Sequence, residues 1–246
     1  MDQNTLAIYI HELRNQCLHS QASFDLFSQA LNNKQGQGIL YGGQMILLPA
    51  SQLSSLLWPT RARARSRGEA LRKILQLTDK HALNDRRLSE VWERADEKVD
   101  EWVSATKGQQ IVFDFVGDPA SLGENAPSDD CMYRGYNPAT QIYTYRGVSF
   151  NLPAVARAIN DIAGRVNAVF RQMFPEQAKA EDEQQKKQIA AQKAAQEAAE
   201  EKAPKKAATK KETPKKAPAK KPAAKKAPAE KAAPKKAATK KVAAKK

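Results

Sequence analysis

The chain is poor in the residues that mark secreted, membrane-bound and most catalytic proteins. Its only two cysteines, Cys17 and Cys131, form no CxxC pair, so we expect a reducing interior and no disulfide framework. No apolar run is long enough to cross a bilayer, and the first residues, MDQN, lack the basic start of a signal peptide. These absences predict a cytoplasmic protein.

Catalytic signatures are missing as well. The histidines occur in no HExxH motif, and the chain has no phosphate-binding P-loop and no GxSxG. Acidic residues crowd the segment 90–101, but Glu93, Glu97 and Asp100 share a face opposite the apolar stripe, which is typical of a solvated helix surface. We therefore expect no cofactor and no metal site, and the sequence favours a binding protein over an enzyme.

What the chain does have is a strongly basic end. Residues 203–246 hold seventeen lysines against two glutamates, a formal charge of +15, whereas the whole chain carries +14. Residues 1–202 therefore sum to about −1, and the high isoelectric point belongs to the end alone. Such an asymmetry indicates an appended arm for a polyanion.

The lysines of this arm come in pairs that recur every five residues. A helix with that spacing would turn by about 140° between pairs, so the pairs would form no single basic face. Six prolines oppose a helix, and the Ala, Pro and Thr spacers offer little apolar surface to a bilayer. We predict a disordered tail without membrane insertion. The residues predicted to bind nucleic acid are the paired lysines Lys205, Lys206, Lys210, Lys211, Lys215, Lys216, Lys220, Lys221, Lys225, Lys226, Lys235, Lys236, Lys240, Lys241, Lys245 and Lys246.

DNA is the polyanion that suits this charge density best, because its duplex carries one charge per about 1.7 Å of axis. Lysine is a point charge without the fork of arginine, and no aromatic residue is interleaved for base stacking. We therefore expect sequence-independent binding, to DNA more than to RNA, by a nucleoid-associated protein. The alternatives are a solubilising tail and a tail that binds anionic lipids.

The runs KKAAPKKAATKK and KKAPAKKPAAKKAPAEK resemble the Lys/Ala/Pro-rich tails of linker histones and of bacterial histone-like proteins. This resemblance covers about the last fifth of the chain and implies histone-like DNA binding through the tail. It does not extend upstream, where no compact winged-helix pattern occurs.

Residues 1–175 have the length of one globular domain with its own core. Apolar residues recur at helical spacing along most of it, and the strongly apolar second segment predicts a buried helix that is kinked or interrupted at Pro49. The predicted helices span 6–31, 39–59, 68–77, 84–104 and 153–174. The apolar stripe of the fourth consists of Leu88, Trp92, Ala95, Val99 and Val103.

A small β element is predicted near 109–151. QQIVFDFVGD alternates like a strand, and QIYTYRGVSFNL has an Arg-Gly turn between β-branched flanks, as in a hairpin. Residues 176–202 hold a single large aliphatic residue, Ile189, which predicts an exposed helical strut about 40 Å long. The predicted fold class is thus mainly α: a helical domain with a small β-hairpin element, an exposed helix and a disordered lysine-rich tail. The domain would serve as a protein-partner or homo-oligomer module.

A second resemblance lies in the helical region. LWPTRARARSRGEALRKIL and LNDRRLSEVWERADEKVDEW are similar to small bacterial helical proteins and to HEPN-type domains, many of which are ribonucleases or bind nucleotides. Where that family has an Asn and a His, this helix has Glu90 and Arg94, while RNQCLH offers Arg14, Asn15 and His19 as a second match. The resemblance implies an alternative function, a HEPN-like protein with a degenerate motif that acts on or binds RNA or nucleotides.

The stretch TRARARSRG places an arginine at every second position, Arg61, Arg63, Arg65 and Arg67. An extended chain would bring all four to one side. The stretch is therefore either a second phosphate-contacting patch or a solvated basic turn.

Overall fold

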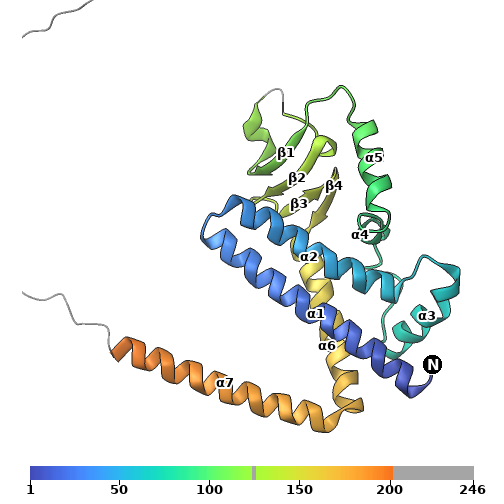
Figure 1. Ribbon diagram of the computed structural model, residues 1–246, viewed down its shortest axis with the longest axis vertical. Coiled ribbons are helices and arrows are strands. Elements are labelled where there is room, and N and C mark those ends of the chain that lie inside the picture. Colours follow the sequence, from blue (N-terminus) through green and yellow to red (C-terminus); the bar gives the residue numbers. More distant parts are fainter. Residues whose placement is uncertain (124–125, 202–246) are drawn as a thin grey trace, which may run out of the picture. The chain divides into compact units, whose positions relative to one another are not determined.

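The computed structural model describes residues 1–123 and 126–201. The chain divides into one unit, Met1–Ala195, and a second, Gln196–Lys246, most of which lies outside the described residues. The described part is mainly helical with a small four-stranded mixed sheet (Figure 1), which confirms the predicted fold class. The predicted lysine-rich tail falls outside the described residues.

Seven α-helices and four strands make up the described residues, together with short 3-10 turns. In chain order they are α1 (Gln3–Asn32), α2 (Gly36–Leu57), α3 (Arg65–Ile74), α4 (Arg86–Glu90), α5 (Ala95–Ala105), β1 (Val112–Val116), β2 (Met132–Asn137), β3 (Ile142–Tyr145), β4 (Val148–Asn151), α6 (Leu152–Met173) and α7 (Pro175–Glu201).

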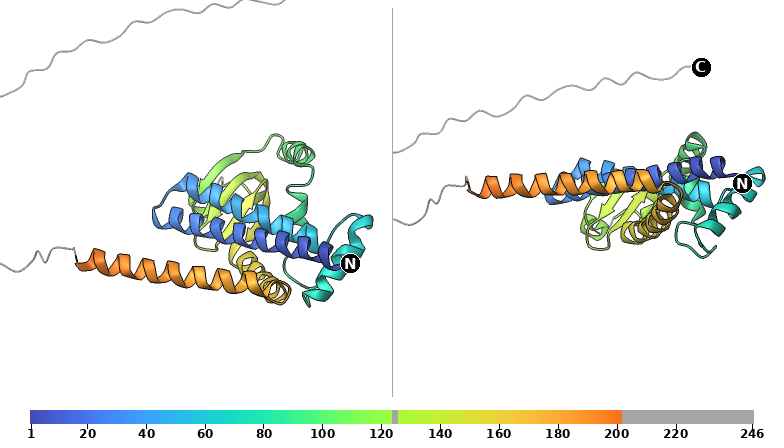
Figure 2. Two further views of the ribbon diagram at one scale, coloured as in Figure 1. Left: turned by 60° about the horizontal axis from the view of Figure 1, so that its bottom comes forward. Right: turned by 90° about the horizontal axis from the view of Figure 1, so that it is seen from below.

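Helices α1 and α2 lie side by side, and α6 packs against α1 (Figures 1 and 2). The Asp2 side chain caps α1 by accepting the Thr5 N–H, and the helix buries one stripe that includes Ile10, Leu13 and Phe27. The helical spacing of α6 likewise buries the predicted residues, among them Ile162 and Val166. The predictions for 6–31 and 153–174 are confirmed.

Of the two alternatives predicted at Pro49, a kink or an interruption, the interruption is wrong, because α2 continues through Pro49 to Leu57. Proline removes one helical hydrogen bond, but Pro49 is buried beside the fully buried Leu47 and Ala50. Tertiary packing therefore holds the turn that the local sequence opposes. None of the described helices is long and apolar enough to span a membrane.

The sheet has the order β1-β2-β3-β4, with β1 parallel to β2 and the other pairs antiparallel. The predicted hairpin is confirmed as β3–β4, and its turn residues Arg146 and Gly147 both have positive φ, 48° and 75°. Two consecutive positive φ values are typical of the type I′ turn that matches the twist of a hairpin. Strand β2 was not expected from the sequence.

The single helix predicted over 84–104 is wrong. Its sequence forms two helices, α4 and α5, and Arg94 between them adopts the left-handed conformation with φ 60°. The break changes the face that α5 buries, so Trp102 is only 9% exposed while Val103 is 54% exposed. The acidic first turn of α5 favours a helix start at that point.

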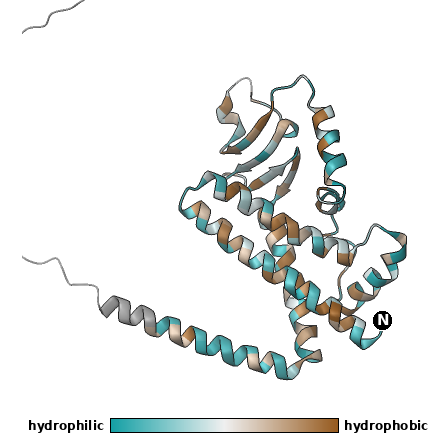
Figure 3. Ribbon diagram, in the orientation of Figure 1, coloured by the Kyte–Doolittle hydropathy of each residue, from teal (hydrophilic) through white to brown (hydrophobic). Residues whose placement is uncertain are grey.

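Helix α7 forms where the exposed strut is predicted, and Figure 3 shows it as mostly hydrophilic. Its first turns nevertheless belong to the packed unit, because Ala178 is buried and the carboxylates of Glu181 and Asp182 bind the guanidinium groups of Arg14 and Arg171. The core thus extends beyond the predicted boundary at residue 175.

The sheet is fastened to the helices by Tyr143 of β3. Its fully buried ring lies on Gly43 of α2, and its hydroxyl donates to the carbonyl of Leu40 at 2.7 Å. A Cβ atom at Gly43 would stand only 2.4 Å from two ring carbons. The absence of a side chain at this position is therefore a packing requirement.

We expect Gly43→Ala to lower the free energy of unfolding by about 1–3 kcal/mol, because the methyl group would overpack the ring of Tyr143. The matched control is Gly164→Ala in the exposed middle of α6, where no heavy atom lies within 4 Å of the added Cβ. That change should stabilise by about 0.5–1 kcal/mol, as helix propensity dictates. Urea unfolding measures the free energy of unfolding of both variants. Equal changes in this free energy would contradict the close packing of Tyr143 on Gly43.

Candidate functional site

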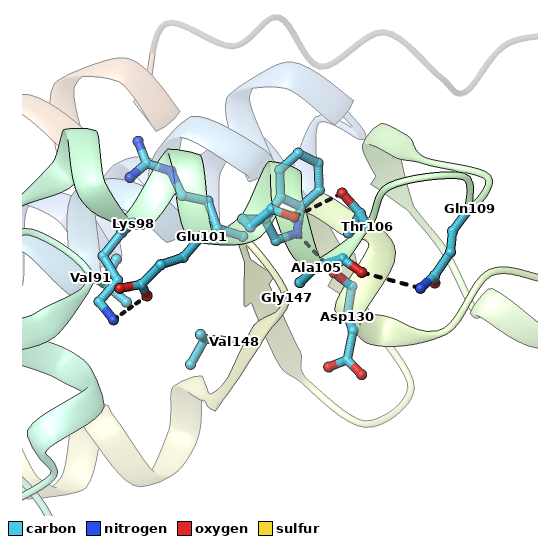
Figure 4. Close-up of a pocket in the computed structure, with 11 residues that line it drawn as sticks. Val91, Lys98, Glu101, Ala105, Thr106, Gln109, Asp130, Gly147 and Val148 are labelled. Carbon is cyan, nitrogen blue, oxygen red and sulfur yellow. Dashed lines mark hydrogen bonds and ion pairs between the residues drawn. The ribbon is translucent and has the colours of Figure 1, made fainter.

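A pocket of about 360 Å³ lies between α5 and the β3–β4 turn (Figure 4). Its apolar wall comes from Val91, Trp102 and Val148. Its polar side chains come from α5, from the residues after α5, from the segment before β2 and from the β3–β4 turn. The ion pair of Lys98 and Glu101 closes one end, with 2.6 Å between Nζ and Oε2. The other lining residues are Ala105, Thr106, Gln109, Asp130, Arg146 and Gly147.

Most polar groups of this pocket already bind protein atoms. The indole Nε1 of Trp102 donates to the Asp130 carbonyl at 2.8 Å, and the Thr106 hydroxyl donates to the Trp102 carbonyl at 2.8 Å. The amide oxygen of Gln109 accepts from the buried Cys131 thiol at 2.7 Å. These bonds anchor α5 to the segment before β2 and leave few groups free to hold a ligand.

Arg146 is the exception. One terminal nitrogen donates to the Ala95 carbonyl at 3.1 Å, and its guanidinium lies 4.8 Å from the ring centroid of Tyr145. Its Nε is shielded from solvent and has no partner among the described residues. The pocket thus offers an apolar cavity with one spare donor, which suits binding of a small group and supplies no nucleophile–base pair.

Sequence reasoning missed this pocket. Arg146 and Gly147 were identified only as a turn, and Trp102 lies one position away from the predicted apolar stripe of its helix. The one available signal was Trp102 itself, which follows Ala95 by seven residues and therefore lies on the same face of the predicted helix as the stripe.

The paired lysines predicted to bind nucleic acid all lie outside the described residues, which end at Glu201. The structure therefore brings none of them together with the pocket. Glu90 is half-buried, whereas the other acidic residues of the 90–101 segment are exposed, as a solvated surface requires. Glu97 binds Arg94 at 3.0 Å. Across residues 1–123 and 126–201, no three acidic, histidine or cysteine side chains form a metal-binding group.

Arg14 and His19, the second match to the HEPN pattern, have different surroundings. The Arg14 guanidinium binds both carboxylate oxygens of Glu181, donates from Nε to Asn167 at 3.2 Å, and lies 4.1 Å from the ring centroid of Phe170. His19 is exposed on α1. Arg14 therefore joins α1 to α6 and α7 through its side chain.

The four alternating arginines do not form an extended row. A 3-10 turn occupies Ala62–Ala64 and α3 begins at Arg65, so the extended arrangement that would bring all four to one side does not occur. Arg67 donates to the Ser55 carbonyl of α2 at 3.2 Å, whereas Arg61, Arg63 and Arg65 are exposed. Helical turns replace the extended chain because α3 packs closely on the end of α2.

His81 is the histidine with the most perturbed environment. Burial lowers its pKa, although the nearby Asp161 carboxylate opposes this effect and Arg165 adds to it. Its Nδ1 accepts the Leu83 N–H at 3.2 Å, so the proton of the neutral ring lies on Nε2, 3.5 Å from Asp161. The ring stacks on Trp58 at 5.3 Å between centroids.

We expect Arg14→Gln to destabilise the protein by about 1–2 kcal/mol, because it removes a bidentate ion pair and a cation–π contact. His19→Ala should stay within about 0.5 kcal/mol, since the side chain is exposed. Thermal unfolding measures both. RNA cleavage by the wild type that is lost in His19→Ala, with no loss of stability, would contradict a purely structural account.

Lowering the pH should destabilise the protein through His81. Because its folded-state pKa is below the unfolded value of about 6.5, the unfolded chain binds the proton first as the pH falls. Stability present above pH ~6.5 is therefore lost as the pH drops towards the folded pKa. His81→Phe, which retains a ring to stack on Trp58, should show a smaller loss of Tm between pH 7.5 and 5.5. An equal loss in both proteins would exclude His81 as the cause.

Comparison with models of known protein families, with curated proteins and with solved structures finds no match to this chain. What the protein binds must therefore be inferred from its own charges, contacts and cavities.

Proposed function

We propose that this protein binds nucleic acid without sequence specificity, DNA more than RNA, through the lysine pairs of residues 203–246. The supporting observation is the charge segregation of the sequence, with +15 in these residues and about −1 in residues 1–202. Lysines at this density displace the counterions of a phosphate backbone, which favours binding whatever the base sequence. A nucleoid-associated location follows from the same chemistry.

The helical unit serves in this proposal as a module for a protein partner or a second copy of the chain. Several of its described ionic groups bind one another, as in the pairs Arg14–Glu181, Arg134–Asp114 and Arg171–Asp182. Residues 1–202 sum to about −1, so the unit has little net charge to hold a long polyanion. The tail therefore supplies most of the affinity.

The alternative is a HEPN-like protein that acts on RNA or nucleotides, with the tail concentrating it on its substrate. The two functions differ in whether the folded unit alone has chemistry. Because Ala178 is buried and Glu181 binds Arg14, the fragment to assay for nuclease activity ends at residue 202 and not at 175.

Full-length protein should bind duplex DNA with an affinity whose logarithm falls against the logarithm of salt concentration with a slope of about −11, if a dozen lysines engage phosphates. Truncation after residue 202 should abolish most of this binding. Two full-length controls distinguish the effect of the lysine charges on DNA binding from the effect of the order of the tail residues. In one control every tail lysine is replaced by glutamine, and in the other the tail residues are shuffled. The first should fail to bind, and the second should bind like the wild type.

Fluorescence anisotropy on two duplexes of unrelated sequence gives all of these values. Equal binding by the intact and truncated chains would refute the proposal. Loss of binding in the shuffled tail would show that the lysine order matters and would contradict counterion release as the main source of affinity. Preference for vesicles of anionic lipid over DNA at the same salt concentration would assign the tail to a membrane surface.

A further inference from the structure

A second pocket, of about 250 Å³, lies where the C-terminal end of α2 meets α3 and α4. Its floor includes Ser54 of α2, and its rim carries the exposed guanidinium groups of Arg65 and Arg86. It is distinct from the α5 pocket and shares no lining residue with it. The remaining lining residues are Trp58, Pro59, Thr60, Asn84 and Ser89.

The charged residues of this lining are all basic, because it contains two arginines and no carboxylate. The side chain of Arg65 makes no hydrogen bond or ion pair with any residue in 1–123 or 126–201. Arg86 binds Glu90 through Nε at 2.7 Å, which leaves its two terminal nitrogens available. Such a lining favours a ligand that only accepts hydrogen bonds and carries negative charge.

Neutral donors add to the two guanidinium groups. Ser54 and Ser89 contribute hydroxyl groups to the lining, and the Ser89 hydroxyl donates to the Arg86 carbonyl at 3.0 Å. The indole Nε1 of Trp58 makes no hydrogen bond among the described residues and is shielded from solvent. The Asn84 amide nitrogen donates to the Asp79 carbonyl, so it is already engaged. Unused donors in a concave site are the groups that an oxyanion would satisfy.

The pocket walls are held in place by contacts that do not use its donors. Gly68 of α3 packs so closely on Pro59 that an added Cβ would stand 2.5 Å from it. The guanidinium of Arg72 donates to the carbonyl of Leu57, at the end of α2. Arg67 and Arg72 thus fix α3 to α2, while Arg65 on the same helix remains free to bind a ligand.

The surrounding charge also favours an anion. Residues 58–90 contain nine Lys and Arg against four Asp and Glu, so they carry +5, and the rest of residues 1–202 sums to about −6. Two carboxylates compete with such an anion. Glu90 already binds Arg86, and Glu69, one turn after Arg65, lines an adjoining depression that shares Arg65 with the pocket but makes no ion pair with Arg65 within the described residues.

We propose that this pocket binds a phosphate monoester. Its volume is below the ~300–1,000 Å³ typical of sites for drug-sized ligands, so it accommodates a headgroup and not a whole nucleotide. Two arginine forks match the terminal oxygens of a monoester, and a concave site admits a chain end more readily than a continuous backbone. The inference does not depend on the lysine tail, since it concerns only described residues.

The test is calorimetric titration of the full-length protein with three probes: inorganic phosphate, a 5′-phosphorylated thymidine dinucleotide and the same dinucleotide with a 5′-hydroxyl. A ligand this short contacts few tail lysines at ~0.2 M salt. We expect binding of inorganic phosphate and of the phosphorylated dinucleotide, and at least about tenfold weaker binding of the hydroxyl form. Binding of inorganic phosphate alone would mean equal, absent binding of the two dinucleotides, so it would overturn the monoester assignment and leave a site for the free ion.

Arg65→Gln should weaken binding at least about tenfold, and Arg65→Lys should restore only part of it because lysine lacks the fork. Arg63→Gln is the matched control, since Arg63 is exposed on the same stretch but does not line the pocket. Its affinity should stay within about twofold of the wild type. Arg86→Gln supplies a second test from α4, and equal Tm values would show that the variants are folded.

Three results would overturn the proposal. They are no binding of any probe, equal binding of the phosphorylated and hydroxyl dinucleotides, and equal losses in Arg65→Gln and Arg63→Gln. If the two dinucleotides bind equally and long DNA binds in a salt-dependent manner, the phosphate site in the pocket is refuted, while DNA binding by the lysine tail is still supported.

Discussion

The arrangement of the helices and the sheet depends on the packing of the Tyr143 ring against Gly43. It fixes β3 on α2, and the two-residue turn at Arg146 then fixes β4 beside β3. Because β4 runs directly into α6, with Asn151 capping that helix at 2.9 Å, the direction of α6 follows from the position of the hairpin. A single aromatic side chain therefore couples the β element to the helix that covers α1.

The predictable parts of this fold are those with a strong local pattern. Helices α1 and α6 repeat apolar residues at helical spacing, and the β3–β4 hairpin has an Arg-Gly turn between strand-forming residues. The helix break at Arg94 is not marked by a glycine or a proline, so the sequence does not predict it. Pro49 does favour a helix break, but packing keeps α2 continuous there. Strand β2, MYRGYN, pairs in parallel with β1 across a long connection, so its place depends on contacts that no local pattern contains.

The same limit applies to the two pockets. The α5 pocket gathers side chains from α5, from the segment before β2 and from the hairpin turn, and these meet only because the sheet and α5 pack together. The basic pocket draws on α2, α3 and α4, and its most informative residue, Arg65, differs from Arg67 only in its partner. Sequence reasoning found the alternating arginines but could not distinguish those that hold the fold from one that is free.

The two proposed phosphate contacts would act at different scales. Lysine is a hydrated point charge, and many such charges give affinity without geometric selection, whereas an arginine fork in a concave site selects the shape of one group. A tail that holds a nucleic acid would keep its ends near the folded unit at an effective concentration that reaches millimolar for short flexible tethers. A pocket that is too weak to retain a phosphate from solution would then be occupied once the tail is bound. Under that coupling the folded unit contributes selectivity for the phosphorylated end and the tail contributes affinity. The two contributions to the binding constant for a phosphorylated end would then multiply.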